Sequence, residues 1–205
     1  MKKEDQEAIE RIRRGEPRAF EGILRRYEER IYNFGLRMCG AVEDARDLLQ
    51  ETFMTAFTYI GRFRGEADLS TWLYKIASSI CIKRKRRGKF EPKYELSLED
   101  LVGEEVSSAP GRAPLLQSTA RGGRSVVGSV PTPDDTVLRR EVRELISRAL
   151  QVLPTKYRIV LVLRDMEGLS AQEVGKVLGL SNEAVKSRLH RARAFMKEQL
   201  RGVMQ

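Results

Sequence analysis

The sequence predicts an all-α protein of two small helical domains joined by a flexible linker. Apolar residues recur at helical spacing in both halves of the chain, and no stretch finds a partner strand. Between the halves, residues 91–133 hold five of the seven prolines and a stretch rich in Gly, Ser and Thr. Such a segment buries too little apolar surface to offset the entropy of ordering it. The predicted domains are therefore residues 1–90 and 134–205.

Three amphipathic helices are expected in the first domain. Apolar positions run from Ile23 to Met38 in the first helix and from Ala45 to Ile60 in the second, with Phe57 on the same apolar stripe. The third helix is predicted to have Ser70 as its N-cap and to end at Gly88.

The second domain opens with a helix that Asp134 or Asp135 caps and that stops before Pro154. Residues 159–163 would suit a strand in isolation, but helical patterns flank them, so a buried helix is expected. Within the linker, only residues 96–101 have the composition of a local turn or short helix.

Composition excludes several classes of protein. A chain of 205 residues with 41% hydrophobic and 33% charged residues is too apolar for full disorder and too polar for a membrane protein. Its amino terminus is charged and has no apolar signal segment, so a cytoplasmic protein is expected. Cys39 and Cys81 lie in apolar helical patterns, which predicts packed, reduced thiols and excludes a disulfide framework.

The charge is concentrated in the two predicted domains. Residues 1–90 carry 20 basic and 14 acidic side chains, residues 91–136 carry 4 and 8, and residues 137–205 carry 14 and 7. Clustered Lys and Arg release counterions from phosphates, whereas acidic stretches are repelled. Two basic domains around an acidic strip therefore indicate nucleic acid as the partner.

A helix-turn-helix is predicted near the carboxyl end. Ser170 and Glu173 form a capping box, Gly179 supplies a left-handed turn, and Ser181 caps a second helix. Small Gly175 allows the two helices to approach closely. Away from its apolar stripe the second helix carries side chains that suit base edges and phosphates in a major groove, namely Asn182, Lys186, Ser187, His190 and Arg191. The alternative is a plain helical hairpin with a solvated basic face.

His190 is the only histidine and has no Cys or carboxylate at ligand spacing, so a DNA contact is expected and no metal site is predicted.

A second motif lies in the first domain. Residues 44–53 place acidic and amide side chains on one helix face, which on its own indicates a solvated amphipathic helix. A Gly-containing loop with aromatic residues follows at residues 63–77, and a basic run follows at residues 83–87. Aromatic rings accept unstacked bases and cations follow the backbone, so this order is typical of a single-strand site.

The chain resembles the extracytoplasmic-function (ECF, group IV) sigma factors of bacterial RNA polymerase. The resemblance rests on the runs at residues 44–53, 63–77 and 168–193, in that order, and spans both predicted domains. It implies that residues 1–90 bind core RNA polymerase and melt the minus-ten element. It also implies that residues 134–205 read the minus-thirty-five element and that the protein serves transcription initiation, including in a stress response.

The resemblance also implies roles for individual residues. The polymerase would be bound by Asp44, Asp47, Leu48, Gln50 and Glu51. The opened, non-template minus-ten strand would be bound by Arg64, Gly65, Glu66, Ala67, Asp68, Leu69, Ser70, Trp72, Tyr74, Lys75, Ser79 and Lys83. Arg164 would join Lys186, Ser187, His190 and Arg191 at the minus-thirty-five element, with Asn182 near the helix start.

Two departures from the family pattern stand out. Relatives often carry Asn where this chain has Ser79, so contacts to the minus-ten strand are expected to differ. The linker is also long for the family.

The expected partners are core RNA polymerase, promoter DNA in duplex and single-stranded form, and an anti-sigma factor, with no cofactor and no membrane insertion. One alternative is a stand-alone helix-turn-helix regulator, but this leaves the motifs of the first domain unused and the chain has no heptad seam for a dimer. An enzyme acting on nucleic acid is disfavoured, because the chain has no phosphate loop, zinc-ligand spacing or catalytic carboxylate cluster.

Overall fold

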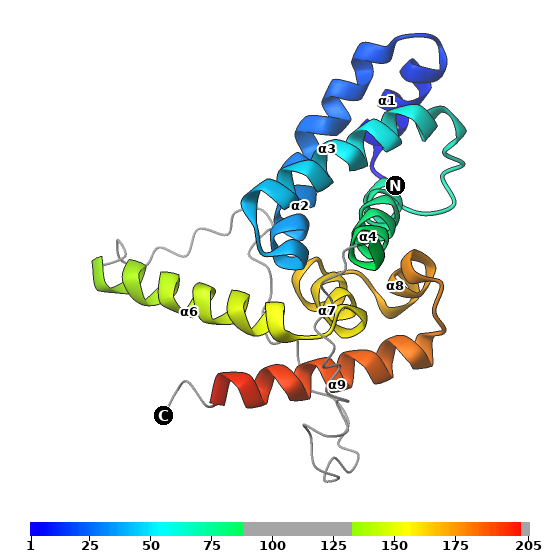
Figure 1. Cartoon of the computed structure of the whole chain (residues 1–205). Helices are drawn as coiled ribbons and strands as arrows, with labels where there is room; N and C mark the ends of the chain where they lie inside the picture. Colours follow the sequence, from blue (N-terminus) through cyan, green and yellow to red (C-terminus); the bar gives the residue numbers. More distant parts are fainter. Residues whose placement is uncertain (88–132, 202–205) are drawn as a thin grey trace.

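The computed structural model describes residues 1–87 and 133–201, with side chains described only up to residue 84 and again from residue 141. Every regular element in these ranges is helical, which confirms the predicted all-α class. Figure 1 shows the helices of the first domain stacked above those of the second. The expected short helix at residues 96–101 lies outside the described residues, as does Gly88. No described helix combines the length and apolarity needed to cross a bilayer.

The first domain is built on two long helices, α2 (Phe20–Cys39) and α3 (Val42–Tyr59), which are joined by a turn at Gly40. Gly40 has a φ of 82°, a left-handed conformation that favours glycine. The fully buried Ile23, Phe34 and Leu48 bind the pair together, and α4 (Leu69–Arg87) packs across both. Short 3-10 turns lie at Pro17–Ala19 and Ile60–Arg62.

Helix α1 (Lys3–Arg13) was not predicted from the sequence. Its buried residues are only Asp5, Ala8 and Ile9, too few for an apolar period. The buried Asp5 carboxylate accepts a hydrogen bond of 2.7 Å from the hydroxyl of Tyr27 on α2. Burial and this carboxylate together raise the pKa of Tyr27. Tertiary contacts therefore hold α1 in place.

Two predicted helix starts were wrong. Helix α4 begins at Leu69, and the amide of Trp72 bonds to the carbonyl of Asp68, so Ser70 lies inside the helix and is not its N-cap. Helix α6 (Pro133–Val152) begins at Pro133, before both predicted caps and inside the predicted linker. Proline suits a first helical position because the amide that it lacks would have no partner there.

The second domain continues with α7 (Thr155–Leu161), a π-helical turn (Val162–Met166), α8 (Ala171–Leu178) and α9 (Asn182–Arg201). The expectation of a buried helix over residues 159–163 is confirmed, although the π turn interrupts it after Leu161. Asp165 within that turn accepts two hydrogen bonds from Arg193 on α9, at 2.8 and 2.6 Å. This paired contact raises the pKa of Arg193 and joins the π turn to α9.

Helices α8 and α9 form the helix-turn-helix that the sequence predicts. Both bonds of the capping box are present: the amide of Glu173 donates to the Ser170 hydroxyl at 3.2 Å, and the amide of Ser170 donates to the Glu173 carboxylate at 2.7 Å. Gly179 is left-handed with a φ of 67°, and the hydroxyl of Ser181 accepts from the amide of Ala184.

The two domains pack against each other in this structure. Buried residues of both form one hydrophobic cluster, and helix α4 of the first domain packs on α8 of the second. Cys81 is buried and Cys39 is half-buried within the first domain, in agreement with the prediction of packed thiols.

Gly175 offers a test of the packing in the helix-turn-helix. Helix propensity alone predicts that Gly175→Ala stabilises α8 by about 1 kcal/mol. A Cβ at Gly175 would instead lie 2.8 Å from the carbonyl oxygen of Leu180, which is closer than real Cβ contacts. We therefore expect Gly175→Ala to lower the free energy of unfolding by about 1–3 kcal/mol, measured by urea denaturation.

The matched control is Gly22→Ala in α2, where the nearest atom to a new Cβ is 3.9 Å away. This change should stabilise the chain by up to about 1 kcal/mol. If both variants shifted stability in the same direction, the close approach at Gly175 would not control the packing.

Candidate nucleic-acid and polymerase interfaces

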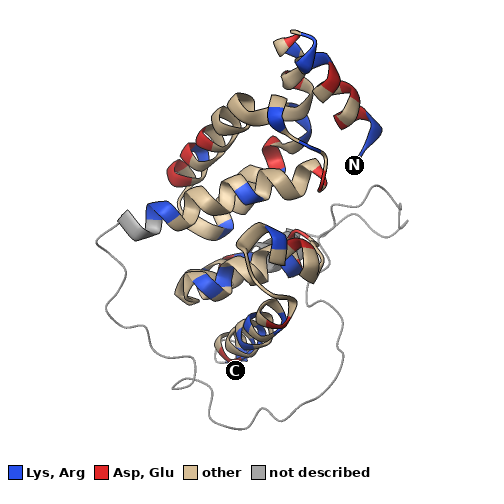
Figure 2. Cartoon of the chain, turned by 90° about the vertical axis from the view of Figure 1, so that its right-hand side faces the viewer, with Lys and Arg blue, Asp and Glu red and all other residues tan. Residues whose placement is uncertain are grey.

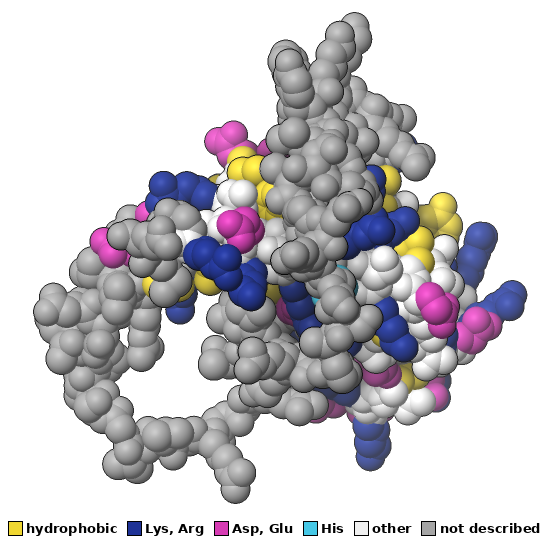
Figure 3. Space-filling view, turned by 90° about the horizontal axis from the view of Figure 1, so that it is seen from below, with side chains coloured by type: hydrophobic (Ala, Val, Ile, Leu, Met, Phe, Trp, Pro, Cys, Tyr) yellow, Lys and Arg dark blue, Asp and Glu magenta, His cyan; other side chains and the backbone are white. Residues whose placement is uncertain are grey.

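The outer face of α9 presents the residues predicted to read duplex DNA. All five are exposed: Asn182, Lys186, Ser187, His190 and Arg191. The buried Val185, Leu189 and Ala192 occupy the opposite stripe and anchor the helix. In the view from below, dark blue Lys and Arg side chains lie beside the cyan histidine atoms (Figure 3). Figure 2 shows further Lys and Arg residues along the helices of the second domain.

Arg164 differs from these five residues. It lies in the π turn, is half-buried, and donates a guanidinium hydrogen bond to the carbonyl of Leu169. Arg164 therefore holds the connection into α8, and only the rest of its guanidinium could face DNA.

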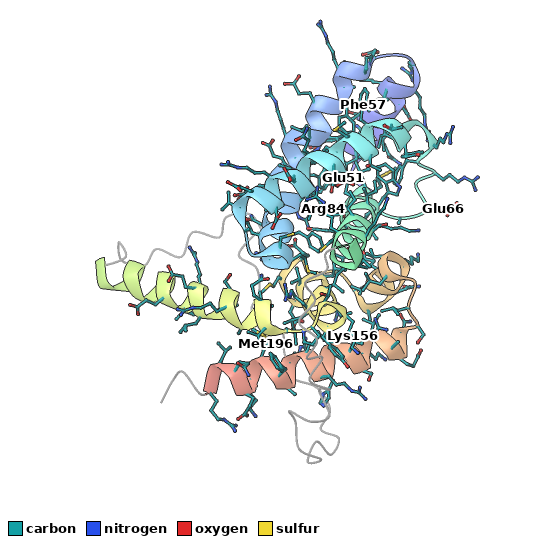
Figure 4. All side chains as sticks on the ribbon, viewed as in Figure 1. Glu51, Phe57, Glu66, Arg84, Lys156 and Met196 are labelled. Atoms are coloured by element: carbon teal, nitrogen blue, oxygen red, sulfur yellow. The ribbon has the colours of Figure 1, made fainter. Side chains whose placement is uncertain are left out.

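A cleft of about 460 Å³ lies beside the loop between α3 and α4. The first domain lines it with Arg62, Phe63, Arg64, Glu66, Ala67, Thr71, Trp72 and Lys75. The rings of Phe63 and Trp72 pack with centroids 5.3 Å apart, while Arg64 and Lys75 are exposed. An aromatic wall edged by cations suits an unstacked base and its backbone. Glu66 lies on the outer side of the loop (Figure 4).

The remaining residues predicted for the minus-ten strand are distributed unevenly. Gly65, Asp68, Ser79 and Lys83 are exposed, and Ser70 is half-buried. Leu69 is fully buried, so its side chain anchors the start of α4 and has no surface to offer DNA. Tyr74 is 1% exposed: its ring packs on Phe34 of the first domain, and its hydroxyl donates to Glu167 of the second. Burial and the Glu167 carboxylate raise the pKa of Tyr74.

A surface of mixed polarity follows the outer face of α3. Asp44, Asp47, Gln50 and Glu51 are exposed there as predicted, but Leu48 is fully buried and belongs to the core beneath. The exposed surface continues into large apolar side chains that the sequence analysis missed: Met54, Phe57 and Tyr59, which are 63%, 50% and 49% exposed.

Phe57 was expected in the core and was placed wrongly. One edge of its ring packs on Phe20, with centroids 5.2 Å apart, while the other side faces solvent. The signal that could have revealed this surface is that Met54 lies four residues after the polar Gln50, which puts both on one face of a helix.

Arg84 of α4 fixes the acidic part of this surface. Its guanidinium donates to the Glu51 carboxylate at 2.8 and 3.2 Å and lies 3.9 Å from the carboxylate of Asp47. Figure 4 shows how α3 and α4 bring Glu51 and Arg84 together. Burial lowers the pKa of Arg84, but the hydrogen bond and charge of Glu51 together with the charge of Asp47 outweigh it, so the pKa is raised.

The comparisons with known proteins match both domains. Residues 23–91 match the family model for sigma-70 region 2, and residues 143–196 match the model for sigma-70 region 4. The ECF RNA polymerase sigma factor SigW of Bacillus subtilis is 35% identical over 193 residues, which cover 94% of this chain and 95% of the relative. The RNA polymerase sigma-H factor of Pseudomonas aeruginosa is 29% identical over 98% of this chain and 96% of its own.

Two solved structures share the fold. One is the sigma factor RpoE of Bartonella quintana in complex with the anti-sigma factor NepR, with a TM-score of 0.58 and 20% identity over 89% of this chain and 96% of that chain. The other is CnrH in complex with the cytosolic domain of CnrY, with a TM-score of 0.64 and 22% identity over 97% of this chain and 98% of that chain. The match in sequence to SigW along nearly the whole chain decides the family. The chain belongs to the ECF RNA polymerase sigma factors.

Proposed function

We propose that this ECF sigma factor, of group IV and cytoplasmic, directs core RNA polymerase to promoters through three surfaces. Residues 1–90 form the domain that binds polymerase and melts the minus-ten element, and residues 134–205 form the domain that reads the minus-thirty-five element. The observation that carries the proposal is that one chain holds both a helix-turn-helix whose second helix has an exposed polar face and an aromatic cleft edged by cations.

The minus-thirty-five element is read by α9. The first turns of a recognition helix enter the major groove, and Asn182, Lys186 and His190 recur every four residues along one side of α9. Lys186 and Arg191 carry charge to guanine edges or phosphates, and Asn182 suits adenine.

The minus-ten element is held open by the cleft beside Phe63 and Trp72. Extruding a base costs a few kcal/mol of stacking and pairing, and the aromatic wall that Phe63 and Trp72 form within the first domain recovers part of this cost without nucleotide hydrolysis. The exposed Arg64, Lys75 and Lys83 lie where the sugar-phosphate backbone of the opened strand would pass. Ser79 offers a short hydroxyl beside this path.

Polymerase is bound by the outer face of α3. We include the apolar Met54, Phe57 and Tyr59 with the polar Asp44, Asp47, Gln50 and Glu51, because they form one continuous exposed surface with Arg84 beside it. Apolar side chains surrounded by polar groups are the usual composition of a protein interface. An anti-sigma factor that covers surfaces of both domains is the expected regulator.

Promoter-specific transcription in vitro tests the function. Addition of the chain to bacterial core polymerase should give transcripts from a defined promoter, and core alone should not. In Lys75→Ala we expect fewer transcripts from duplex promoters and a smaller defect on a premelted template, because the lost contact acts on the opened strand. Arg18→Ala removes an exposed cation from the same domain away from the cleft and is the control. Equal loss on duplex and premelted templates would contradict the role of Lys75.

The recognition helix is tested by Lys186→Ala and Arg191→Ala. Each lost base contact is worth about 1–3 kcal/mol, so both variants should weaken use of the minus-thirty-five element and relax its sequence preference. Lys156→Ala on α7 makes the same change of charge in the same domain but off α9. Promoter selectivity that stays unchanged in both α9 variants would remove this helix from the proposal.

The polymerase surface is tested by Gln50→Ala and Met54→Ala. Interface residues at the centre of a contact cost more than about 1 kcal/mol when truncated, which corresponds to affinity for core polymerase that is about five- to tenfold weaker. The loss should be the same for every promoter, because this surface does not touch DNA. Glu29→Ala, on the exposed side of α2, is the control. If both variants bound core polymerase as tightly as Glu29→Ala does, the α3 surface would be excluded as the polymerase-binding site.

A further inference from the structure

The second domain caps the end of a helix in the first domain. Helix α2 ends at Cys39, so the carbonyls of its last turn lack partners within the helix. The amide side chain of Gln151 donates to the carbonyl of Arg37 at 3.0 Å, and the guanidinium of Arg158 donates to the carbonyl of Met38 at 2.8 Å. Arg158 also places a positive charge at the negative end of the α2 dipole.

Arg158 is held in place from its own domain. It is 3% exposed and also bonds to the side chain and carbonyl of Gln151 and to the carbonyl of Leu153. Burial lowers the pKa of Arg158, and the neighbouring thiols Cys81 and Cys39 act in the opposite direction. The absence of a side chain at Gly40 is also required, because a Cβ there would lie 2.8 Å from the side chain of Gln151.

Glu167 makes a second link between the domains. It follows the π turn of the second domain, and its side chain is only 5% exposed. Its carboxylate accepts hydrogen bonds from the guanidinium of Arg37 and from the hydroxyl of Tyr74, both in the first domain. A buried carboxylate needs such donors to offset its loss of hydration.

Glu173 makes a third link, beside the cleft. The hydroxyl of Thr71, itself 3% exposed, lies 3.4 Å from the Glu173 carboxylate and donates to it. Burial raises the pKa of Glu173, but the hydrogen bonds from Ser170 and Thr71 outweigh it, so the pKa is lowered and the carboxylate stays charged. Lys176 and Val177 of α8 form the remaining wall of the cleft.

We propose that Glu167 and Glu173 occupy the positions of DNA phosphates on the strand-binding face, so that the free chain is closed against the minus-ten strand. This inference rests on the proposed function of the cleft. Arg37, Tyr74 and Thr71 are hydrogen-bond donors of the kind that phosphate oxygens accept, and in the closed chain two carboxylates of the second domain hold them. When the domains separate, Arg37 and Thr71 join the residues that contact the strand.

Closure covers the strand-binding face of the first domain and leaves the outer face of α9 exposed. The five outward residues of α9 remain exposed in the closed chain. The observed affinity for single-stranded DNA is the affinity of the open chain multiplied by the fraction of chains that are open. The affinity of α9 for duplex DNA does not depend on that fraction. The free chain therefore avoids single-stranded DNA until polymerase separates the two domains.

A charge exchange across the Arg37 and Glu167 pair tests closure in the full-length chain. Glu167→Arg should open the chain and raise its radius of gyration in small-angle X-ray scattering. Arg37→Glu changes the partner of Glu167 in the first domain and should also open the chain. The double variant Arg37→Glu with Glu167→Arg restores the pair with reversed charges and should return the compact form. A wild-type chain as expanded as Glu167→Arg would overturn the closed state, as would a double variant that stays open.

Binding of a fluorescent 15-nucleotide DNA single strand of random sequence, without polymerase, tests the masking. We expect Glu167→Arg to bind it about fivefold more tightly than Glu198→Arg, which makes the same change of charge at an exposed position of the second domain. Equal binding by these two variants would overturn the masking of the strand site. Thermal unfolding checks that each variant folds. If Glu167→Arg does not fold, Arg37→Glu replaces it in the scattering experiment. Scattering needs no polymerase, so a failure of promoter-specific transcription would count separately against the proposed function.

Discussion

One buried guanidinium joins the two domains at the end of α2. Arg158 reaches from α7 to the carbonyl of Met38 at the end of α2, and its other donors bond to the turn between α6 and α7. All of these partners are neutral oxygens, so the charge is stabilised by hydrogen bonds and by the α2 dipole. Because a buried cation without such partners is costly, the turn between α6 and α7 and the end of α2 are positioned together.

The polar groups inside the helix-turn-helix bond to one another, and the proposed DNA-binding face of α9 is exposed. The capping box, the left-handed Gly179 and the paired bonds between Asp165 and Arg193 use polar groups that would otherwise compete for solvent or for a ligand. Val174, Val185 and Leu189 bury the apolar stripe. The outer face of α9 keeps Asn182, Lys186 and His190 exposed, and side chains of these types can bind bases and phosphates.

The two motifs of the first domain each contain buried and exposed residues. On α3 the buried Leu48 lies between the exposed Asp47 and Gln50, and on α4 the buried Leu69 comes just before the half-buried Trp72. The buried members set the position of the helix, and their neighbours are exposed or half-buried at the surface. A variant of Leu48 or Leu69 would therefore change the fold of the first domain before it changed binding.

Neighbouring residues along the chain were enough to predict the helical class, the helix-turn-helix with its caps, and the basic outer face of α9, because helical periodicity and capping are local effects. The sequence did not reveal α1, which tertiary contacts such as that of Asp5 with Tyr27 hold in place. The packing of helices against one another leaves Phe57 half exposed and brings Tyr74 into contact with Glu167, 93 residues further along the chain. Burial and long-range pairing depend on how helices pack in space, and the periodicity within a single helix cannot predict that packing.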